Sequence, residues 1–167
     1  MDTPRREVTM AAALPWFLFA HVLSALWFAA GALTAPAVLA RTRRAGSLAE
    51  RVFGLRLAWR LVAGFSIPGA VVSGLLGVHL IETRGYSWQA GWVHASLWIW
   101  GVVLLATALL LAPWLHGALR EAEASLEAGL PSEKLKRQTA AGWPGWIAGF
   151  DALAAVVLTL LMMLRPF

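Results

Sequence analysis

Histidine side chains are the groups in this sequence best suited to bind a metal or a cofactor, and one of them lies inside a long apolar segment. His21 falls within residues 16–36, and no Asp, Glu, Lys or Arg occurs in residues 11–40. An ionisable side chain in a membrane-crossing segment costs several kcal/mol unless it is paired, hydrated or bound to something. Neutral imidazole is a usual axial ligand of haem iron and also binds copper well. His21 is therefore the first candidate ligand.

The helical face that carries His21 is made mostly of small residues. In the three- and four-residue spacing of a helix, its members are Ser24, Ala25, Phe28, Gly31, Ala32 and Ala35. All but the phenylalanine are small, and small residues let a neighbouring helix approach closely within a membrane. We therefore expect this face to meet another helix, or a flat ligand, instead of lipid.

Further candidates lie near the ends of later apolar segments. The predicted cofactor-binding set is His21, His94 and Arg165, in which imidazoles would bind haem iron and the guanidinium would pair with a propionate. The predicted metal set is His21, His94 and His79, with copper as the alternative to haem b. Each residue also has a structural interpretation, because a histidine near a helix end can hydrogen-bond a carbonyl, and an arginine there can anchor to lipid headgroups.

Composition places the chain among membrane proteins. The 167 residues are 59% hydrophobic and 14% charged, with a mean hydropathy of +0.67, whereas soluble domains carry about 25% charged residues. The sequence has no cysteine, which excludes disulfides, iron–sulfur clusters and thiolate zinc sites. The net charge of +5 is interpreted as a topology signal and not as nucleic-acid binding. The length suits a single transmembrane domain, residues 1–167.

Four apolar segments are long enough to cross a bilayer, which takes about 20 residues. They predict an all-α membrane protein, a four-transmembrane-helix bundle with spans at about residues 14–39, 60–82, 92–115 and 146–164. In the second span, Gly69, Ser73 and Gly77 form a ridge spaced four apart, which predicts close packing against a neighbour.

The charged connections carry two further local signals. In residues 41–60, Ser47 and Glu50 have the spacing of a capping box, which predicts a short helix on the membrane surface. Residues 116–138 form an amphipathic connection, and the break at residues 129–131 divides it into two helical pieces.

Basic residues set the expected orientation. The first and third connections hold ten of the 14 Lys and Arg residues, and the opposite side holds four. The positive-inside rule therefore predicts a multi-pass protein of the cell inner membrane with its N-terminus and C-terminus both on the non-cytoplasmic side. His21 would then lie roughly 10 Å below the outer interface, with His79 and His94 near the same side and His116 on the other.

One carboxylate falls inside the fourth span. Asp151 lies near the predicted cytoplasmic end of that span, at a depth similar to Arg56 and Arg60. We expect an ion pair that fixes the bundle in preference to a proton relay.

The order of these motifs resembles a known group of membrane proteins. His21 followed ten residues later by Gly31, then Pro36 and a basic loop, resembles the first helix of the CopD/HemJ-like membrane proteins. IPGAVVSGLLG, residues 67–77, is similar to their second helix, and Trp92-Val93-His94 to the start of their third. Arg165-Pro166-Phe167 resembles the ending of HemJ-type protoporphyrinogen oxidases. Pro113 fits better a branch of small predicted integral membrane proteins of unknown function in the same group.

This resemblance implies a four-helix bundle in which His21 is the first-choice haem b ligand and His94 a second functional histidine. The sequence departs from the HemJ pattern at Phe28, where a tryptophan is expected, and at Ser96, where a lysine is expected. The later Tyr-His of the third helix is also absent. These departures argue against protoporphyrinogen oxidation but not against haem binding.

Three functions follow as hypotheses. The first is a redox or haem-handling membrane protein with haem b. The second is a copper-handling membrane protein that uses the three histidines of the metal set. The third is a non-catalytic accessory subunit of a larger membrane complex, or a homo-oligomer, in which the histidines are structural. Membrane lipids are the common partner, enzymatic activity is left open, and no phosphate-binding loop, Ser/His/Asp set or nucleic-acid surface is present.

Overall fold

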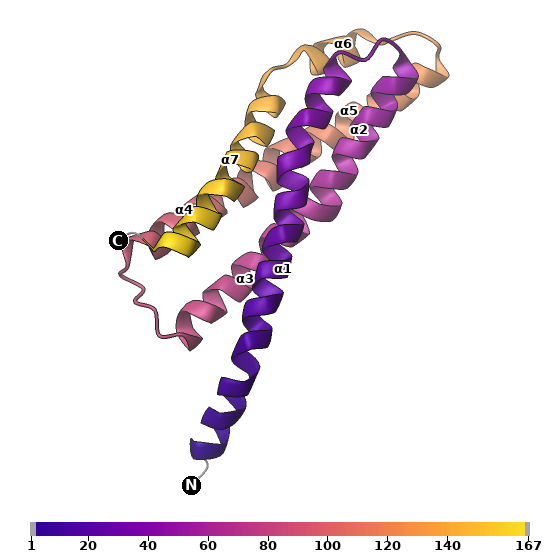
Figure 1. The fold of residues 1–167 in the computed structure, drawn as a ribbon. Helices are drawn as coiled ribbons and strands as arrows, with labels where there is room; N and C mark the ends of the chain where they lie inside the picture. The colour runs from indigo at the N-terminus through magenta and orange to yellow at the C-terminus, as the bar shows by residue number, and fades with distance from the viewer. Residues whose placement is uncertain (1–2, 166–167) are drawn as a thin grey trace.

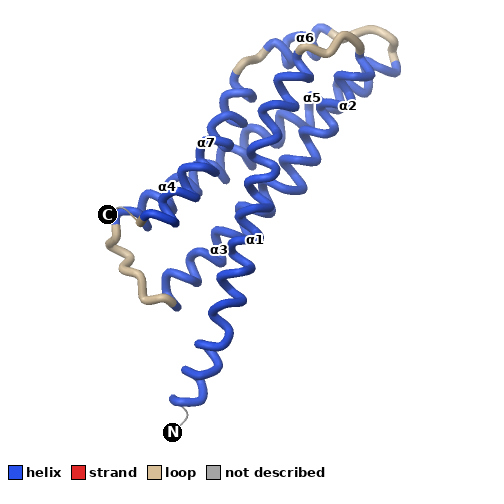
Figure 2. Tube along the Cα trace, in the orientation of Figure 1, coloured by secondary structure: helices blue, strands red, loops and turns tan. Residues whose placement is uncertain are grey.

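The computed structural model describes residues 3–165, and every regular element in that range is a helix (Figure 2). Four helical segments are long and apolar enough to cross a membrane, namely Leu14–Arg43, Leu48–Thr83, Gly91–Glu127 and Glu133–Leu164. This confirms the predicted class, an all-α membrane protein with four spans. Several helices extend beyond the predicted boundaries of the spans, because the helix continues from the apolar segment into polar and charged residues.

Seven α-helices and two π-helical turns make up this part of the chain (Figure 1). In chain order they are α1 (Thr3–Arg43), α2 (Leu48–Leu61), η1 (Val62–Ser66), α3 (Ile67–Thr83), α4 (Gly91–Ala106), η2 (Thr107–Leu111), α5 (Ala112–Glu127), α6 (Glu133–Ala140) and α7 (Trp143–Leu164). The π-turns join α2 to α3 and α4 to α5, so the second and third spans are continuous helices.

Each π-turn comes directly before a proline near the start of the next helix. Ile67 N–H donates to the Val62 carbonyl, and Ala112 N–H donates to the Thr107 carbonyl, both five residues back. The following residues, Pro68 and Pro113, have no N–H to donate, so the ordinary ladder is interrupted at the same places. A π-turn is one way in which a helix accommodates such an interruption.

The two ends of the bundle differ in charge. The start of α1, the end of α7 and the connection at residues 84–90 lie toward one end, which we name the terminal end. The helix α6 and the α1–α2 connection lie at the other end, which we name the basic end (Figure 1). The basic end carries most of the arginines and lysines of the chain.

The capping signal in the first connection is confirmed, but the prediction of a separate surface helix is wrong. The Ser47 hydroxyl accepts from Glu50 N–H at 3.2 Å, and the Glu50 carboxylate accepts from Gly46 N–H at 3.0 Å. The helix that starts there, α2, runs without a break into the second span. It packs along α1 and α5, and the Arg56 guanidinium pairs with Glu123 on α5 at 2.6 Å.

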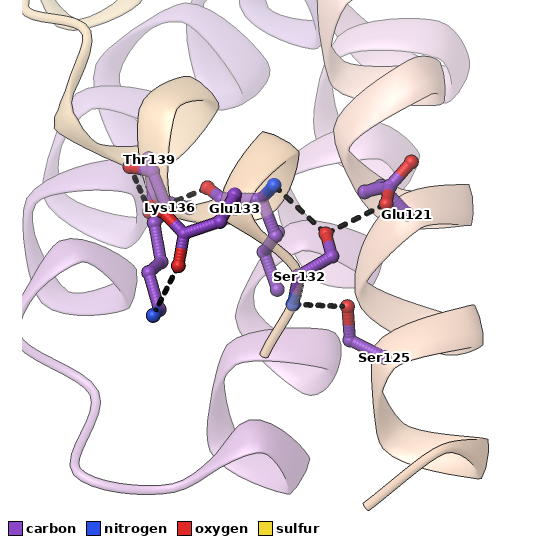
Figure 3. A network of polar contacts seen from close by, with 7 residues as sticks. Glu121, Ser125, Ser132, Glu133, Lys136 and Thr139 are labelled. Atoms are coloured by element: carbon purple, nitrogen blue, oxygen red, sulfur yellow. Dashed lines mark hydrogen bonds and ion pairs between the residues drawn. The ribbon is translucent and has the colours of Figure 1, made fainter. Parts of the chain in front are cut away.

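The predicted break between α5 and α6 is confirmed, and a polar network holds the two helices together (Figure 3). The Ser132 hydroxyl donates to Glu121 at 2.7 Å and accepts from Leu135 N–H at 3.0 Å, while Ser132 N–H donates to Ser125 at 3.2 Å. Lys134 lies 3.0 Å from the same Glu121 carboxylate.

Two hydrophobic clusters form the core. The basic-end cluster comprises Ala35, Leu39, Val52, Leu55, Ala58, Val62, Leu111, Ala112, Leu115, Ala118, Leu119, Ala122, Leu135 and Ala148. The terminal-end cluster comprises Phe28, Ala32, Ala70, Val103, Ala154 and Ala155. Ten of these twenty residues are alanine, and small residues of this kind let the spans approach one another closely.

Candidate functional site

His21 is buried between α1 and α3. Only 8% of the residue is exposed, and its Nδ1 lies 2.9 Å from the Ser73 carbonyl oxygen. A carbonyl oxygen only accepts, so we assign the ring hydrogen to Nδ1. In the neutral imidazole the other nitrogen, Nε2, then carries a lone pair that can bind a metal.

Glycines on α3 create the space for this contact. A Cβ on Gly77 would lie 3.2 Å from Cε1 of His21 and 3.6 Å from its Nδ1. Two turns earlier, a Cβ on Gly69 would lie 2.7 Å from the Phe28 Cα and closer still to its backbone nitrogen. The predicted packing of this ridge against a neighbour is confirmed, and α1 is that neighbour.

The predicted helix-facing side of α1 is also confirmed. Ser24, Phe28, Gly31, Ala32 and Ala35 are all buried. The Ser24 hydroxyl donates to the His21 carbonyl at 2.9 Å, so this polar side chain is satisfied within its own helix.

Trp100 is a residue of this region that sequence reasoning missed. Its indole N–H donates to the Ala70 carbonyl on α3 at 2.8 Å, and its ring covers Gly74. The helix α3 therefore receives one aromatic donor from α1 and one from α4. The sequence does show a further small residue on α3, Gly74, against which an aromatic ring could pack. With ten tryptophans in the chain, however, it does not show which of them makes the contact.

His94 and His79 are placed differently from His21. His94 is exposed, because the buried face of α4 passes through Val93 and Ser96. His79 is partly buried, and its ring packs against Phe17 with the two ring centroids 4.5 Å apart. Across the described part of the chain, no group of three or more His, Cys, Asp or Glu residues could hold a metal ion.

Arg165 closes the last helix at the terminal end. It caps α7 in the left-handed conformation, with φ 45°. Its guanidinium lies 4.8 Å from the Tyr86 ring centroid and 6.0 Å from that of Trp92, distances at which a cation and an aromatic ring attract. Arg165 thus joins α7 to the start of α4. Pro166 and Phe167, which belong to the ending that resembles HemJ, lie outside the described residues.

The remaining histidine and methionines lie on the surface. His116 is exposed near the basic end, and its ring packs against Trp59 with centroids 5.2 Å apart. Met162 and Met163 are exposed on α7. A shallow apolar cavity of about 200 Å³ between α1 and α7 contains none of the predicted site residues; it is lined by Ala29, Leu33, Ala155, Val156, Thr159 and Leu160.

The predicted ion pair of Asp151 with an arginine of the second span is wrong. Asp151 is 2% exposed, and its Oδ2 accepts from the Thr107 hydroxyl at 2.6 Å. Arg56 instead faces α5, where it pairs with Glu123. Similar depth in the membrane did not bring the partners together, because α7 packs on α1 and α4 while α2 packs on α1 and α5.

Comparison with known proteins identifies a family but no function. No curated protein and no solved structure matches the chain. Residues 16–166, which cover the four spans except for the first two residues of the first, match the family described as "Predicted integral membrane protein (DUF2269)". The chain is thus a multi-pass integral membrane protein that belongs to the DUF2269 family.

Proposed function

We propose that this protein binds a b-type haem through Nε2 of His21 and has a redox or haem-handling role in the inner membrane. The observation that carries the proposal is the buried His21 ring, whose Nδ1 is engaged by the Ser73 carbonyl at 2.9 Å. A histidine that ligates a metal almost always donates its other ring N–H to a carbonyl, a carboxylate or a water.

The hydrogen bond on Nδ1 suits Nε2 of His21 to bind a haem iron. The Ser73 carbonyl belongs to the backbone of α3, so it fixes both the tautomer and the ring plane of His21 and makes Nε2 more basic. Because Gly77 has no side chain, the His21 ring can lie against the backbone of α3 at this point. A bound haem would supply one-electron redox chemistry, with a potential set by its axial ligands and the burial of the site.

His94 and Arg165 are secondary members of the proposed site. His94 projects from the outside of α4, so as a second ligand it would bind haem at the bundle surface. Arg165 stacks on Tyr86 and Trp92 at the terminal end, and a stacked guanidinium keeps N–H groups that can pair with a propionate.

The other two hypotheses have no specific observation in their favour. A copper site of three histidines would need them gathered, and among the residues with a described placement no such group occurs. The subunit hypothesis would need a surface that distinguishes a protein partner from lipid. The inner-membrane orientation is supported by the excess of arginine and lysine at the basic end, which would face the cytoplasm.

An absorption spectrum of the full chain tests the proposal. The protein is produced with haem supply, purified in detergent and measured oxidised and reduced, beside His21→Ala and the matched control His116→Ala. We expect a Soret band in the wild type and the control, and its loss in His21→Ala. Copper content is measured on the same samples.

Gly77→Ala keeps the test valid if His21→Ala fails to fold. The added methyl would press on the His21 ring, so the band should shift or weaken, whereas Gly101→Ala, with no atom within 4 Å of its Cβ, should leave it unchanged. Haem-free wild type after reconstitution with haemin would refute the proposal. An unchanged band in folded His21→Ala would refute it equally.

A further inference from the structure

A polar layer separates the two hydrophobic clusters in the middle of the bundle. On α7, Asp151 lies between Ala148 of the basic-end cluster and Ala154 of the terminal-end cluster. In the third span, Thr107 lies in the same way between Leu111 and Val103. These two polar residues meet in the 2.6 Å hydrogen bond between their side chains.

The second span repeats this pattern. Ser66 is 2% exposed and lies between Val62 of the basic-end cluster and Ala70 of the terminal-end cluster. A Cβ on Gly31 of α1 would collide with the Ser66 hydroxyl, so the first span passes directly against this residue. Ser66 ends η1 and Thr107 begins η2, which places both π-turns at the polar layer. Such turns are frequent at functional sites.

Asp151 is incompletely satisfied within this layer. Its Oδ2 accepts from Thr107, but its Oδ1 is buried and has no hydrogen-bond partner in the described structure. The residue is 98% buried in a segment that crosses the membrane, since 2% of it is exposed. A carboxylate in that position without a cation is costly, and a proton removes the charge.

Among residues 14–165, no lysine or arginine side chain forms an ion pair with the Asp151 carboxylate. The elements that pack most on α7 are α1, α4 and η2, and α5 reaches its first turn through the contact of Trp114 with Trp143. Residues 14–40 and 91–115 contain no Asp, Glu, Lys or Arg, and His116, the first titratable residue of α5, packs against Trp59 instead. The titratable groups of those two ranges, His21 and His94, lie toward the terminal end, and α7 itself has no other charge in residues 143–164. The Arg43 guanidinium lies against Gly145, six residues and about 9 Å along α7 from Asp151.

We infer that Asp151 is a reversible proton-binding site in the middle of the membrane, with Thr107 as its positioning residue. A hydronium ion would give its proton to Oδ1 and leave as water, so that an O–H bond forms and the carboxylate becomes neutral. Thr107 holds Oδ2 and leaves Oδ1 as the acceptor.

A proton suits this site better than a metal ion. One carboxylate oxygen has no partner, and in the part of the chain that the structure describes Asp151 belongs to no group of three or more His, Cys, Asp or Glu residues that could hold a metal ion. Sodium and other hard cations require six or so oxygen ligands around the ion. The inference goes beyond haem binding and is independent of it, because Asp151 and His21 lie in different parts of the bundle.

Isotope labelling isolates this carboxyl group. The chain contains only two aspartates, Asp2 and Asp151, so the Asp2→Asn variant carries a single one. The full chain is labelled with carboxyl-¹³C aspartate, reconstituted into phosphatidylcholine vesicles and titrated by infrared difference spectroscopy. We expect a ¹³C-shifted stretch of a protonated carboxyl group that appears and disappears reversibly with pH in the wild type and in Asp2→Asn.

The Thr107 variants test the positioning role and do not require Asp151 to be replaced. Thr107→Val should shift both the frequency of the band and its titration midpoint, while Thr107→Ser, which keeps the hydroxyl, should restore both. A carboxyl that stays ionised, or stays protonated, across the pH range in which the protein remains folded would overturn the inference. So would loss of the band when sodium replaces choline at constant pH, because that result would indicate a cation site.

Discussion

The close contact between α1 and α3 predicts a large penalty for one methyl group at Gly69. A Cβ there would lie 2.7 Å from the Phe28 Cα, a distance at which one of the two helices must move. The obstacle is backbone and not the tip of a flexible side chain, so rotamer changes cannot relieve it. Overpacking of this kind typically costs about 1–3 kcal/mol.

A matched glycine on another helix removes the effect of helix propensity. Alanine is favoured over glycine in a helix by about 1 kcal/mol, and this gain applies to Gly69→Ala and Gly101→Ala alike. Gly101 lies within α4, and a Cβ there would meet no atom within 4 Å. The difference in unfolding free energy between the two variants therefore reports the packing penalty, about 1–3 kcal/mol against Gly69→Ala.

The assay is equilibrium unfolding in mixed micelles with an increasing fraction of denaturing detergent. Far-ultraviolet circular dichroism follows helix content, and the fluorescence of the ten tryptophans follows tertiary packing. If Gly69→Ala proves as stable as Gly101→Ala, α1 and α3 are not in contact at this point. The placement of His21 against Ser73 would then fail too, because the same helix pair produces it.

Two further predictions concern hydrogen bonds of carboxyl groups. Replacing Thr107 by Val should destabilise the protein by about 0.5–1.5 kcal/mol where Asp151 is protonated and about 1.5–3 kcal/mol where it is ionised, with Thr107→Ser near wild type in the same unfolding assay. The Glu121 carboxylate accepts from the Ser132 hydroxyl at 2.7 Å and lies 3.0 Å from the Lys134 ammonium, so it ties α6 to α5. Amide exchange in α6 should therefore be faster in Glu121→Ala than in the wild type, and equal exchange rates would contradict this contact.

The four spans, and the helix faces by which α1 and α3 meet, could be predicted from the sequence. Long segments without charge have few alternatives to a membrane-crossing helix, and the small face of α1 and the ridge on α3 are patterns that a helix displays directly. Gly69 and Gly77 do contact Phe28 and His21. These predictions succeeded because they depend on residues close together in the sequence.

Predictions about which residue meets which across helices were less successful. Asp151 was expected to pair with an arginine at similar depth, but its partner is Thr107. Depth can be estimated from sequence, whereas the neighbours of a helix follow from the packing of the whole bundle. The π-turns η1 and η2 depend in the same way on how each helix accommodates a proline among its neighbours, so a proline alone did not predict them.

The glycines of α3 explain how this helix can bind donors from two sides without losing its own ladder. In an α-helix the Cβ of a residue leans toward the N-terminus and covers the carbonyl one turn earlier. The Ala70 carbonyl, which accepts from Trp100, has Gly74 four residues later, and the Ser73 carbonyl, which accepts from His21, has Gly77 four residues later. In both cases the missing Cβ is the space that the aromatic ring fills.

This arrangement links the packing of the bundle to the proposed ligand. A side chain at residue 77 would meet the His21 ring and loosen the hydrogen bond that fixes its tautomer. A side chain at residue 74 would displace Trp100 and the contact between α3 and α4, and leave His21 untouched. Each glycine makes room for an aromatic ring from a neighbouring helix, but only Gly77 lies beside the imidazole of His21. The proposed haem site therefore depends on residue 77 more than on residue 74.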